Sequence, residues 1–188
     1  APAVRTLYWL GAVALYLAAI GWVVLTGDRP GHWAFLPAIL PIALFVAWSD
    51  LARMKIPNQA VLACATAFVL IGPLVLPWDV FFWRLLQGVA VLVAGFVLNM
   101  ARLIGAGDAK FGAAMAPYFA GGDLPLILNL FAAILLAAFV AHRTVRAFPP
   151  LRSVAPHWES WTHAKFPMGL ALGPALALYL VLCTLAGV

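Results

Sequence analysis

Seven long apolar runs, separated by short polar stretches, make up most of the 188-residue chain. Most of them approach the roughly 17–25 residues that a helix needs to cross the hydrocarbon core of a bilayer. They cover Leu7–Thr26, Ala34–Leu51, Asn58–Leu76, Phe82–Leu103, Asp108–Ala120, Leu124–His142 and Phe166–Gly187. The run Asp108–Ala120 is the shortest, and the pattern leaves open whether it crosses the full core.

Composition excludes a soluble domain. The chain is 66% hydrophobic and only 9% charged, whereas soluble domains are roughly 25% charged. With no strand pattern, this predicts an all-α, polytopic membrane helix bundle of six to seven transmembrane helices in one domain, residues 1–188. Residues 1–33 are expected to add an N-terminal helix. Residues 143–165 are expected to form a cytoplasmic or interfacial loop anchored by Trp158 and Trp161.

The net charge of +5 would suggest nucleic acid as a partner of a soluble protein, but here topology explains it better, so no nucleic acid is expected. With a cytoplasmic N-terminus, nine basic residues fall on the cytoplasmic side and two, Arg29 and Arg84, on the other. This is a positive-inside distribution. The nine are Arg5, Arg53, Lys55, Arg102, Lys110, Arg143, Arg146, Arg152 and Lys165.

Metal and redox chemistry find little support in the sequence. The two cysteines, Cys64 and Cys183, lie in apolar stretches and form no CxxC pair, so neither a zinc site nor a disulfide framework is expected. The spacing of His157, Glu159 and His163 matches no common helical ligand pair. We therefore expect no metal and no cofactor.

Two aspartates, Asp50 and Asp108, end and begin apolar runs at the cytoplasmic side. An ionised carboxylate at membrane depth costs at least a few kcal/mol, so such residues are usually functional. Two neighbouring carboxylates can share one proton and activate a water between them, as in aspartyl proteases. Gly105 and Gly107 would permit positive φ and close backbone approach before Asp108, which lies at a helix start.

Three segments resemble the motifs of type IV prepilin peptidases. Ser49–Asn58 (SDLARMKIPN) is similar to their first aspartate box, and Gly105–Phe111 (GAGDAKF) to their second, the GxGD signature followed by Lys. Phe166–Ala171 (FPMGLA) is similar to the Pro-x-Gly opening of their last helix. The segments occur in the family's order.

The resemblance implies a GxGD intramembrane aspartyl protease fold with Asp50 and Asp108 as the catalytic pair. It implies removal of the short basic leader of prepilins or pseudopilins at the cytoplasmic face of a bacterial inner membrane, with the pilus assembly machinery as a further partner. Without CxxC pairs and the zinc-binding insert, the chain resembles the standalone form of tight-adherence (Flp) pilus systems, so N-methylation is not expected. The residues expected to support the site are Gly105, Gly107, Lys110, Arg53, Lys55, Pro57, Asn58, Pro167 and Gly169.

Several of these supporting residues also have simpler interpretations. Arg53, Lys55 and Lys110 could serve as positive-inside anchors. Pro57-Asn58 could simply start a helix, and Gly169 with Gly173 forms a small-xxx-small pair that favours close helix packing.

Three other functions remain open. A proton-coupled transporter could use the aspartates as a relay, although relay carboxylates usually lie nearer mid-membrane. A presenilin-like or signal-peptide-peptidase-like protease also carries GxGD, but this chain has Ser49 where those have Tyr before the first aspartate. The third alternative is a catalytically silent component of a pilus machine.

Overall fold

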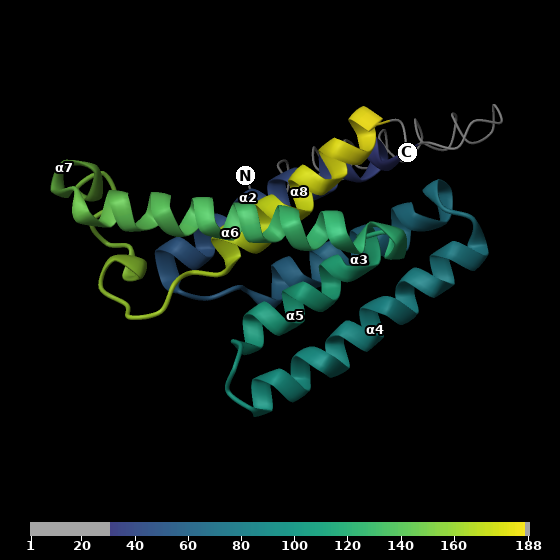
Figure 1. The fold of residues 1–188 in the computed structure, drawn as a ribbon, viewed down its shortest axis with the longest axis horizontal. Helices are drawn as coiled ribbons and strands as arrows, with labels where there is room; N and C mark the ends of the chain where they lie inside the picture. The colour runs from purple at the N-terminus through teal and green to yellow at the C-terminus, as the bar shows by residue number, and fades with distance from the viewer. Residues whose placement is uncertain (1–30, 187–188) are drawn as a thin grey trace, which may run out of the picture.

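The computed structural model describes residues 31–186, and in that part of the chain all regular elements are helices (Figure 1). The long helices are α2 (Leu36–Arg53), α3 (Asn58–Val75), α4 (Trp78–Met100), α6 (Leu124–Ala147) and α8 (Gly169–Ala186). Shorter elements are η1 (His32–Phe35), α5 (Ala106–Met115), η2 (Ala116–Tyr118), η3 (Gly121–Asp123), α7 (Pro149–Arg152) and η4 (Glu159–Trp161). The predicted all-α membrane bundle is confirmed.

Five helical segments are long and apolar enough to cross a membrane among the residues described. They contain α2, α3, α4, α6 and α8. Helix α5 has only 10 residues, which at 1.5 Å per residue gives about 15 Å, half of the hydrocarbon core. The predicted first run, Leu7–Thr26, lies outside the described residues, as does most of the predicted N-terminal helix.

Helices α2 and α8 pack with their backbones in contact. A Cβ built on Gly173 would lie 2.5 Å from the carbonyl oxygen of Ala43, so no larger residue fits without moving the helices apart. Gly169, one turn earlier in α8, meets Asp50 of α2 in the same way, with 2.8 Å between the built Cβ and the Asp50 Cβ. The close packing expected of this glycine pair is therefore present.

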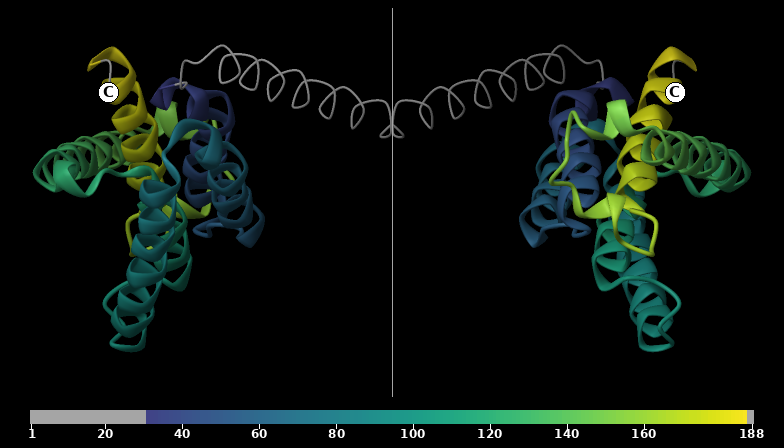
Figure 2. Two further views of the ribbon diagram at one scale, coloured as in Figure 1. Left: turned by 90° about the vertical axis from the view of Figure 1, so that its right-hand side faces the viewer. Right: turned by 90° about the vertical axis from the view of Figure 1, so that its left-hand side faces the viewer.

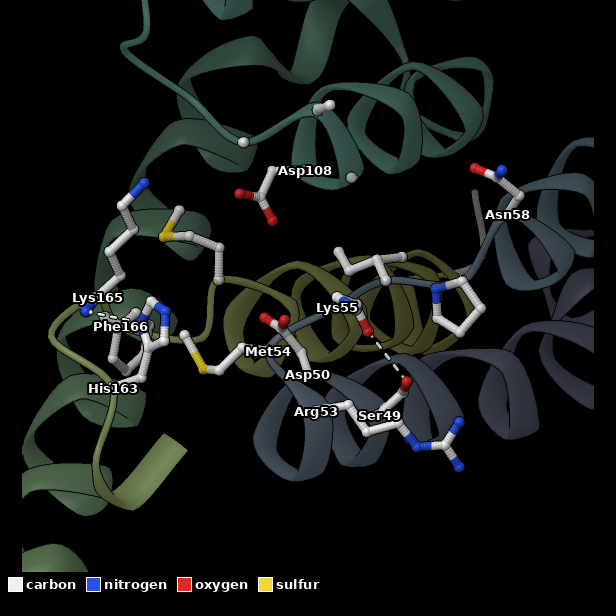
Figure 3. A pocket seen from close by; sticks show the side chains of 16 residues that line it. Ser49, Asp50, Arg53, Met54, Lys55, Asn58, Asp108, His163, Lys165 and Phe166 are labelled. Atoms are coloured by element: carbon white, nitrogen blue, oxygen red, sulfur yellow. Dashed lines mark hydrogen bonds between the residues drawn. The ribbon is translucent and has the colours of Figure 1, made fainter. Parts of the chain in front are cut away.

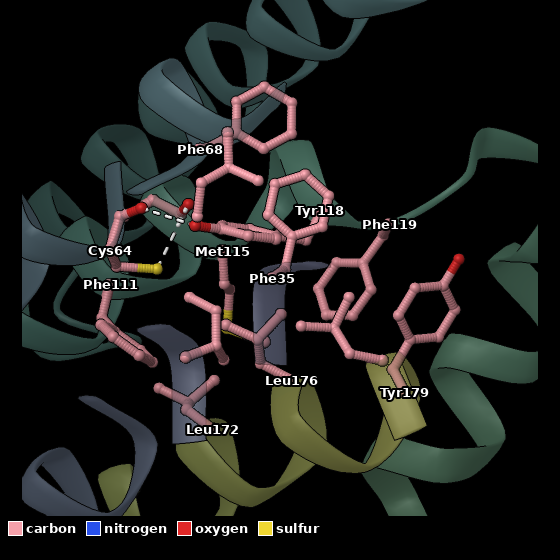
Figure 4. Packing of buried hydrophobic residues seen from close by; sticks show 14 of the residues in the cluster. Phe35, Cys64, Phe68, Phe111, Met115, Tyr118, Phe119, Leu172, Leu176 and Tyr179 are labelled. Atoms are coloured by element: carbon pink, nitrogen blue, oxygen red, sulfur yellow. Dashed lines mark hydrogen bonds between the residues drawn. The ribbon is translucent and has the colours of Figure 1, made fainter. Parts of the chain in front are cut away.

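An aromatic cluster holds the carboxyl end of the α5 segment inside the bundle (Figure 4). The Tyr118 ring makes edge contacts with Phe35 at 5.0 Å and Phe68 at 5.1 Å between centroids. Its hydroxyl donates to the carbonyl oxygen of Cys64 at 2.7 Å, which satisfies the one polar atom of a fully buried side chain. Since Tyr118 ends η2, the short helix that directly follows α5, these contacts fix the depth of α5 beside α3.

Polar side chains satisfy the backbone where α5 gives way to turns. The Tyr179 hydroxyl accepts from the N–H of Ala120 at 2.9 Å and donates to Asp123 Oδ2 at 2.7 Å. Gln87 Nε2 donates to the carbonyl oxygen of Ala116 at 2.9 Å, and the buried Arg84 donates to that of Pro117 at 3.4 Å. Non-helical backbone at membrane depth needs such partners, so these bonds allow α5 to end early.

The predicted loop 143–165 differs from expectation in two ways. Helix α6 continues to Ala147, because Arg143 and Arg146 interrupt the apolar run without breaking the helix and the first helix breaker is Pro149. Trp161 is only 7% exposed and stacks on His142 with centroids 5.3 Å apart. Trp161 is thus a packing residue, and the prediction that it anchors the loop in the headgroup layer is wrong. Helix α6 itself lies at the edge of the bundle (Figure 2).

Candidate active site

Asp50 and Asp108 face each other across one pocket (Figure 3). Asp50 is in the last turn of α2 and Asp108 in the first turn of α5, so an end of one helix meets the start of another. The pocket has a volume of about 660 Å³. It is lined by Ser49, Asp50, Arg53, Met54, Lys55, Ile56, Pro57, Asn58, Gly105, Ala106, Gly107, Asp108, His163, Lys165, Phe166 and Met168.

The Asp50 carboxylate is held in one orientation. Its side chain is 5% exposed, and Oδ2 accepts the N–H of Gly169 at 2.6 Å. The built Cβ on Gly169 would lie within 3.2 Å of Cβ, Oδ2 and Cγ of Asp50. A glycine is therefore needed at position 169 so that the start of α8 can approach this carboxylate.

Asp108 is the third residue of α5, and its carboxylate lies against the backbone of Gly105, the residue that caps the helix. A Cβ on Gly105 would lie 2.6 Å from Asp108 Oδ2, so the glycine makes room for the carboxylate. The positive φ that these glycines would permit is not used: Gly105 has φ −70°, and Gly107 is not left-handed either.

The electrostatic setting of Asp108 favours its protonated form. Burial and, next, the negative charge of Asp50 raise the pKa of Asp108 from 3.8 to about 6. The N–H of Gly105 and the positive charge of Lys165 lower this pKa but do not cancel the rise.

The residues expected to support the site divide into two groups. Those lining the pocket are Arg53, Lys55, Pro57, Asn58, Gly105 and Gly107. Three others do not line it: Gly169 contacts Asp50 directly, Pro167 is fully buried at the entry to α8, and Lys110 donates to Asn58 Oδ1 at 3.3 Å. Arg53 also lies over the Trp48 ring, 5.1 Å from its centroid.

Two local features shape the turn after Asp50. Met54 adopts a left-handed conformation, φ 51°, and its N–H donates to the carbonyl oxygen of Asp50 at 2.9 Å, which ends α2. The buried Ser49 hydroxyl donates to the carbonyl oxygen of Lys55 at 3.0 Å. Together they direct residues 54–57 across the pocket opening.

Sequence reasoning missed one wall of the pocket. His163, Lys165, Phe166 and Met168 come from the segment that leads into α8, and Figure 3 shows His163 and Lys165 beside Phe166 on the side of Met54. This segment was expected to be an interfacial loop. The available signal was the position of this segment directly before Pro167-Met168-Gly169. If that motif contacts Asp50, the residues just before it must also lie near Asp50.

The chemistry available is that of two carboxylates facing each other across one pocket. Within residues 31–186, no group of three or more His, Cys, Asp or Glu side chains could hold a metal ion. A protonated carboxyl facing an ionised one can donate to a carbonyl oxygen while the other takes a proton from water.

Comparison with known proteins agrees with this arrangement. A family model described as the type IV leader peptidase family matches residues 37–142, a segment that includes both Asp50 and Asp108. Neither the curated proteins nor the solved structures contain a match to the chain.

Proposed function

The chain belongs to the type IV leader peptidase family, and from this premise we propose that it is an aspartyl endopeptidase that removes the short basic leader of prepilins or pseudopilins. The observation that carries the proposal is the placement of Asp50 and Asp108 on opposite sides of one pocket. Both come from helix ends, at the side where most of the basic residues fall. We therefore place the active site at the cytoplasmic face of a bacterial inner membrane.

In the proposed reaction a water lies between the two carboxyl groups. The ionised carboxylate takes a proton from the water while the water oxygen attacks the scissile carbonyl carbon. The other carboxyl group, which is protonated, donates its proton to the carbonyl oxygen. Collapse of the tetrahedral intermediate breaks the C–N bond. The amine of the new N-terminus leaves with the proton that the first carboxylate took from the water, and a hydroxyl of the intermediate returns a proton to the second carboxylate as the C=O bond re-forms. The raised pKa of Asp108, about 6, supports its holding the shared proton in mildly acidic solution, and the two carboxyl groups titrate as one pair.

The charges around the pocket bear on how the leader binds. Arg53, Lys55 and Lys165 all line the pocket, and together they would repel a basic peptide placed deep inside it. We expect the basic leader to lie along the anionic headgroups, with only the residues around the scissile bond between Asp50 and Asp108.

The test is co-expression with a candidate prepilin that carries a basic leader, followed by the size and N-terminal sequence of the product. Asp50→Asn and Asp108→Asn should each abolish processing. Asp79→Asn should not, because Asp79 lies in the first turn of α4 and does not line the pocket. Normal processing by either active-site variant would refute the mechanism. Mass spectrometry of the product should show an unmethylated N-terminus, in keeping with the proposed lack of a methyltransferase activity.

Within the described residues, Asp50 and Asp108 lie at helix ends, whereas relay carboxylates usually lie nearer mid-membrane; this argues against the transporter alternative. The family match favours a leader peptidase over a presenilin-like protease. A proton-flux assay in liposomes, with the Asp108→Asn variant as control, distinguishes a relay from a protease.

A further inference from the structure

A second cavity, of about 270 Å³, lies between α3 and α4 with α5 beneath it; we call it the α3–α4 groove. Its walls include Ala65 and Val69 from α3 and Leu92 from α4, and its floor includes Ala113 from α5. The lining is apolar with one exception, Lys110. Helix α5 is shorter than α3 and α4 and is rich in alanine. Its small side chains form the floor of the groove, and α3 and α4 form the walls.

The groove adjoins the active site at a single hydrogen bond. Lys110 lines the groove, Asn58 lines the catalytic pocket, and Lys110 Nζ donates to Asn58 Oδ1 at 3.3 Å. In Figure 3 Asn58 lies at the edge of the pocket, on the side opposite His163 and Lys165. A chain leaving the pocket past Asn58 would therefore enter the groove directly.

We propose that the α3–α4 groove binds the first turns of the substrate's hydrophobic helix while the residues before that helix lie in the catalytic pocket. The inference rests on the proposed function. From Val61 to Val69 the α3 wall rises about 12 Å, or about two helical turns. Small side chains on the floor, such as Ala113 and Ala114, allow a docked helix to approach closely.

The need to satisfy the backbone favours a helix as the occupant. A peptide that leaves the pocket and enters lipid has no water for its N–H and C=O groups, so it must become helical at once. The docking surface must therefore adjoin the pocket and run away from it into the bilayer, as this groove does. A lipid acyl chain would fill the apolar walls equally well but gives no reason for the groove to lead to Asn58.

A second surface also adjoins the pocket but fits a helix less well. This cavity, about 440 Å³, is lined by Ala132, Leu135, Leu136 and Phe139 of α6 and by Phe166. It consists of one helix face and one ring, without a second helical wall. It serves as the matched comparison in the test.

Cross-linking decides between these surfaces. Single cysteines replace Val69 or Leu92 in the groove, or Leu136 on α6, in full-length Asp108→Asn protein so that bound substrate is not cut. All three side chains are well exposed, and the native Cys64 and Cys183 are buried. The substrate carries one cysteine at successive positions after its cleavage site. Cross-links should form at the groove positions with a period of three to four residues, at least tenfold above those at Leu136→Cys.

Preferential cross-linking at Leu136→Cys, or no cross-links at the groove, would overturn the inference. The cross-links are scored whether or not wild-type protein cuts the same substrate. Absence of cutting counts against the proposed function, whereas cutting without cross-links in the groove counts against the groove alone.

A matched pair of alanines on α3 gives a second measurement. Ala65 lines the groove and Ala63 lies on another face of the same helix. Ala65→Phe should raise KM at least fivefold for the full substrate and leave cleavage of a peptide lacking the hydrophobic helix unchanged. Ala63→Phe should change neither. An unchanged KM in Ala65→Phe, with copurified lipid lost instead, would identify the groove as a lipid site.

Discussion

The N–H of Gly169 donates to Oδ2 of Asp50 at 2.6 Å and joins residues 119 positions apart. Through this bond the start of α8 orients one carboxylate of the pair. We predict that Gly169→Ala lowers kcat by at least about a hundredfold, because its Cβ would lie 2.8 Å from the Asp50 Cβ. The measurement is processing of a prepilin in detergent.

Two other glycines serve as controls for this prediction. Gly173→Ala would clash with the carbonyl oxygen of Ala43, at 2.5 Å, so it should destabilise the α2–α8 pair. Gly112 has no atom within 4 Å of its built Cβ, so Gly112→Ala should be neutral or stabilise α5 by up to about 1 kcal/mol. If Gly169→Ala retains full activity, the hydrogen bond to Asp50 is not needed for catalysis.

Lys165 should shift the alkaline limit of activity. Its positive charge lowers the pKa of Asp108, which stands at about 6. Activity that depends on protonated Asp108 falls as the pH rises through this value. Lys165→Met removes the charge, so it should move the descending limb of kcat/KM against pH toward higher pH. Arg152→Met, at an exposed position outside the pocket, should leave the limb in place; a shift of the same size in both variants would contradict the assignment.

Asp108 should also reduce stability at neutral pH. Its pKa is raised in the folded state from 3.8 to about 6, so the folded protein binds the proton more tightly than the unfolded chain. This stabilisation is fully present below about pH 4 and is lost as the pH rises through about 6. Asp108→Asn should therefore raise Tm at pH 8, by about 2–4 °C for an effect of about 1 kcal/mol.

The same variant should gain much less at pH 4, where Asp108 is protonated in the folded protein and only about half ionised in the unfolded chain. Thermal unfolding in detergent at the two pH values checks this. An equal gain at pH 4 and pH 8 would show that the effect comes from packing and not from the charge.

The apolar runs predicted most helices well, because length and breakers define a membrane helix. The run Asn58–Leu76 became α3, Asn58–Val75, since Pro57 and Pro77 bound it on either side. Charge alternation placed Asp50 and Asp108 at one end of the bundle without any knowledge of contacts. The apolar run misplaced the end of α6, because arginines end an apolar run but do not end a helix.

Contacts within the site could not be predicted in the same way. The role of Gly105 depends on how the Asp108 side chain folds back over it, and the sequence showed only a residue that permits positive φ. The wall formed by His163 and Lys165 lies in a segment without hydrophobic periodicity, so no pattern gave its path. Such details follow from the approach of α8 to α2, which depends on tertiary packing.

The Tyr179 hydroxyl should be important for stability far from Asp50 and Asp108. It accepts from the N–H of Ala120 and donates to Asp123 Oδ2, so Tyr179→Phe leaves both groups without this partner at the turn that follows α5. Losing these two hydrogen bonds between part-buried groups costs about 0.5–1.5 kcal/mol each. We expect a fall in Tm of several degrees and faster proteolysis within residues 116–123.

Thr184→Val is the matched control on α8, because the Thr184 hydroxyl donates to the carbonyl oxygen of Leu180 within the same helix. Its loss should change Tm little. The catalytic pocket is at the opposite end of α5, so Tyr179→Phe should reduce kcat far less than Gly169→Ala does. If instead Tyr179→Phe removed activity at unchanged Tm, the turn would influence Asp108 through α5, and the aromatic contacts of Tyr118 would not be enough to fix that helix.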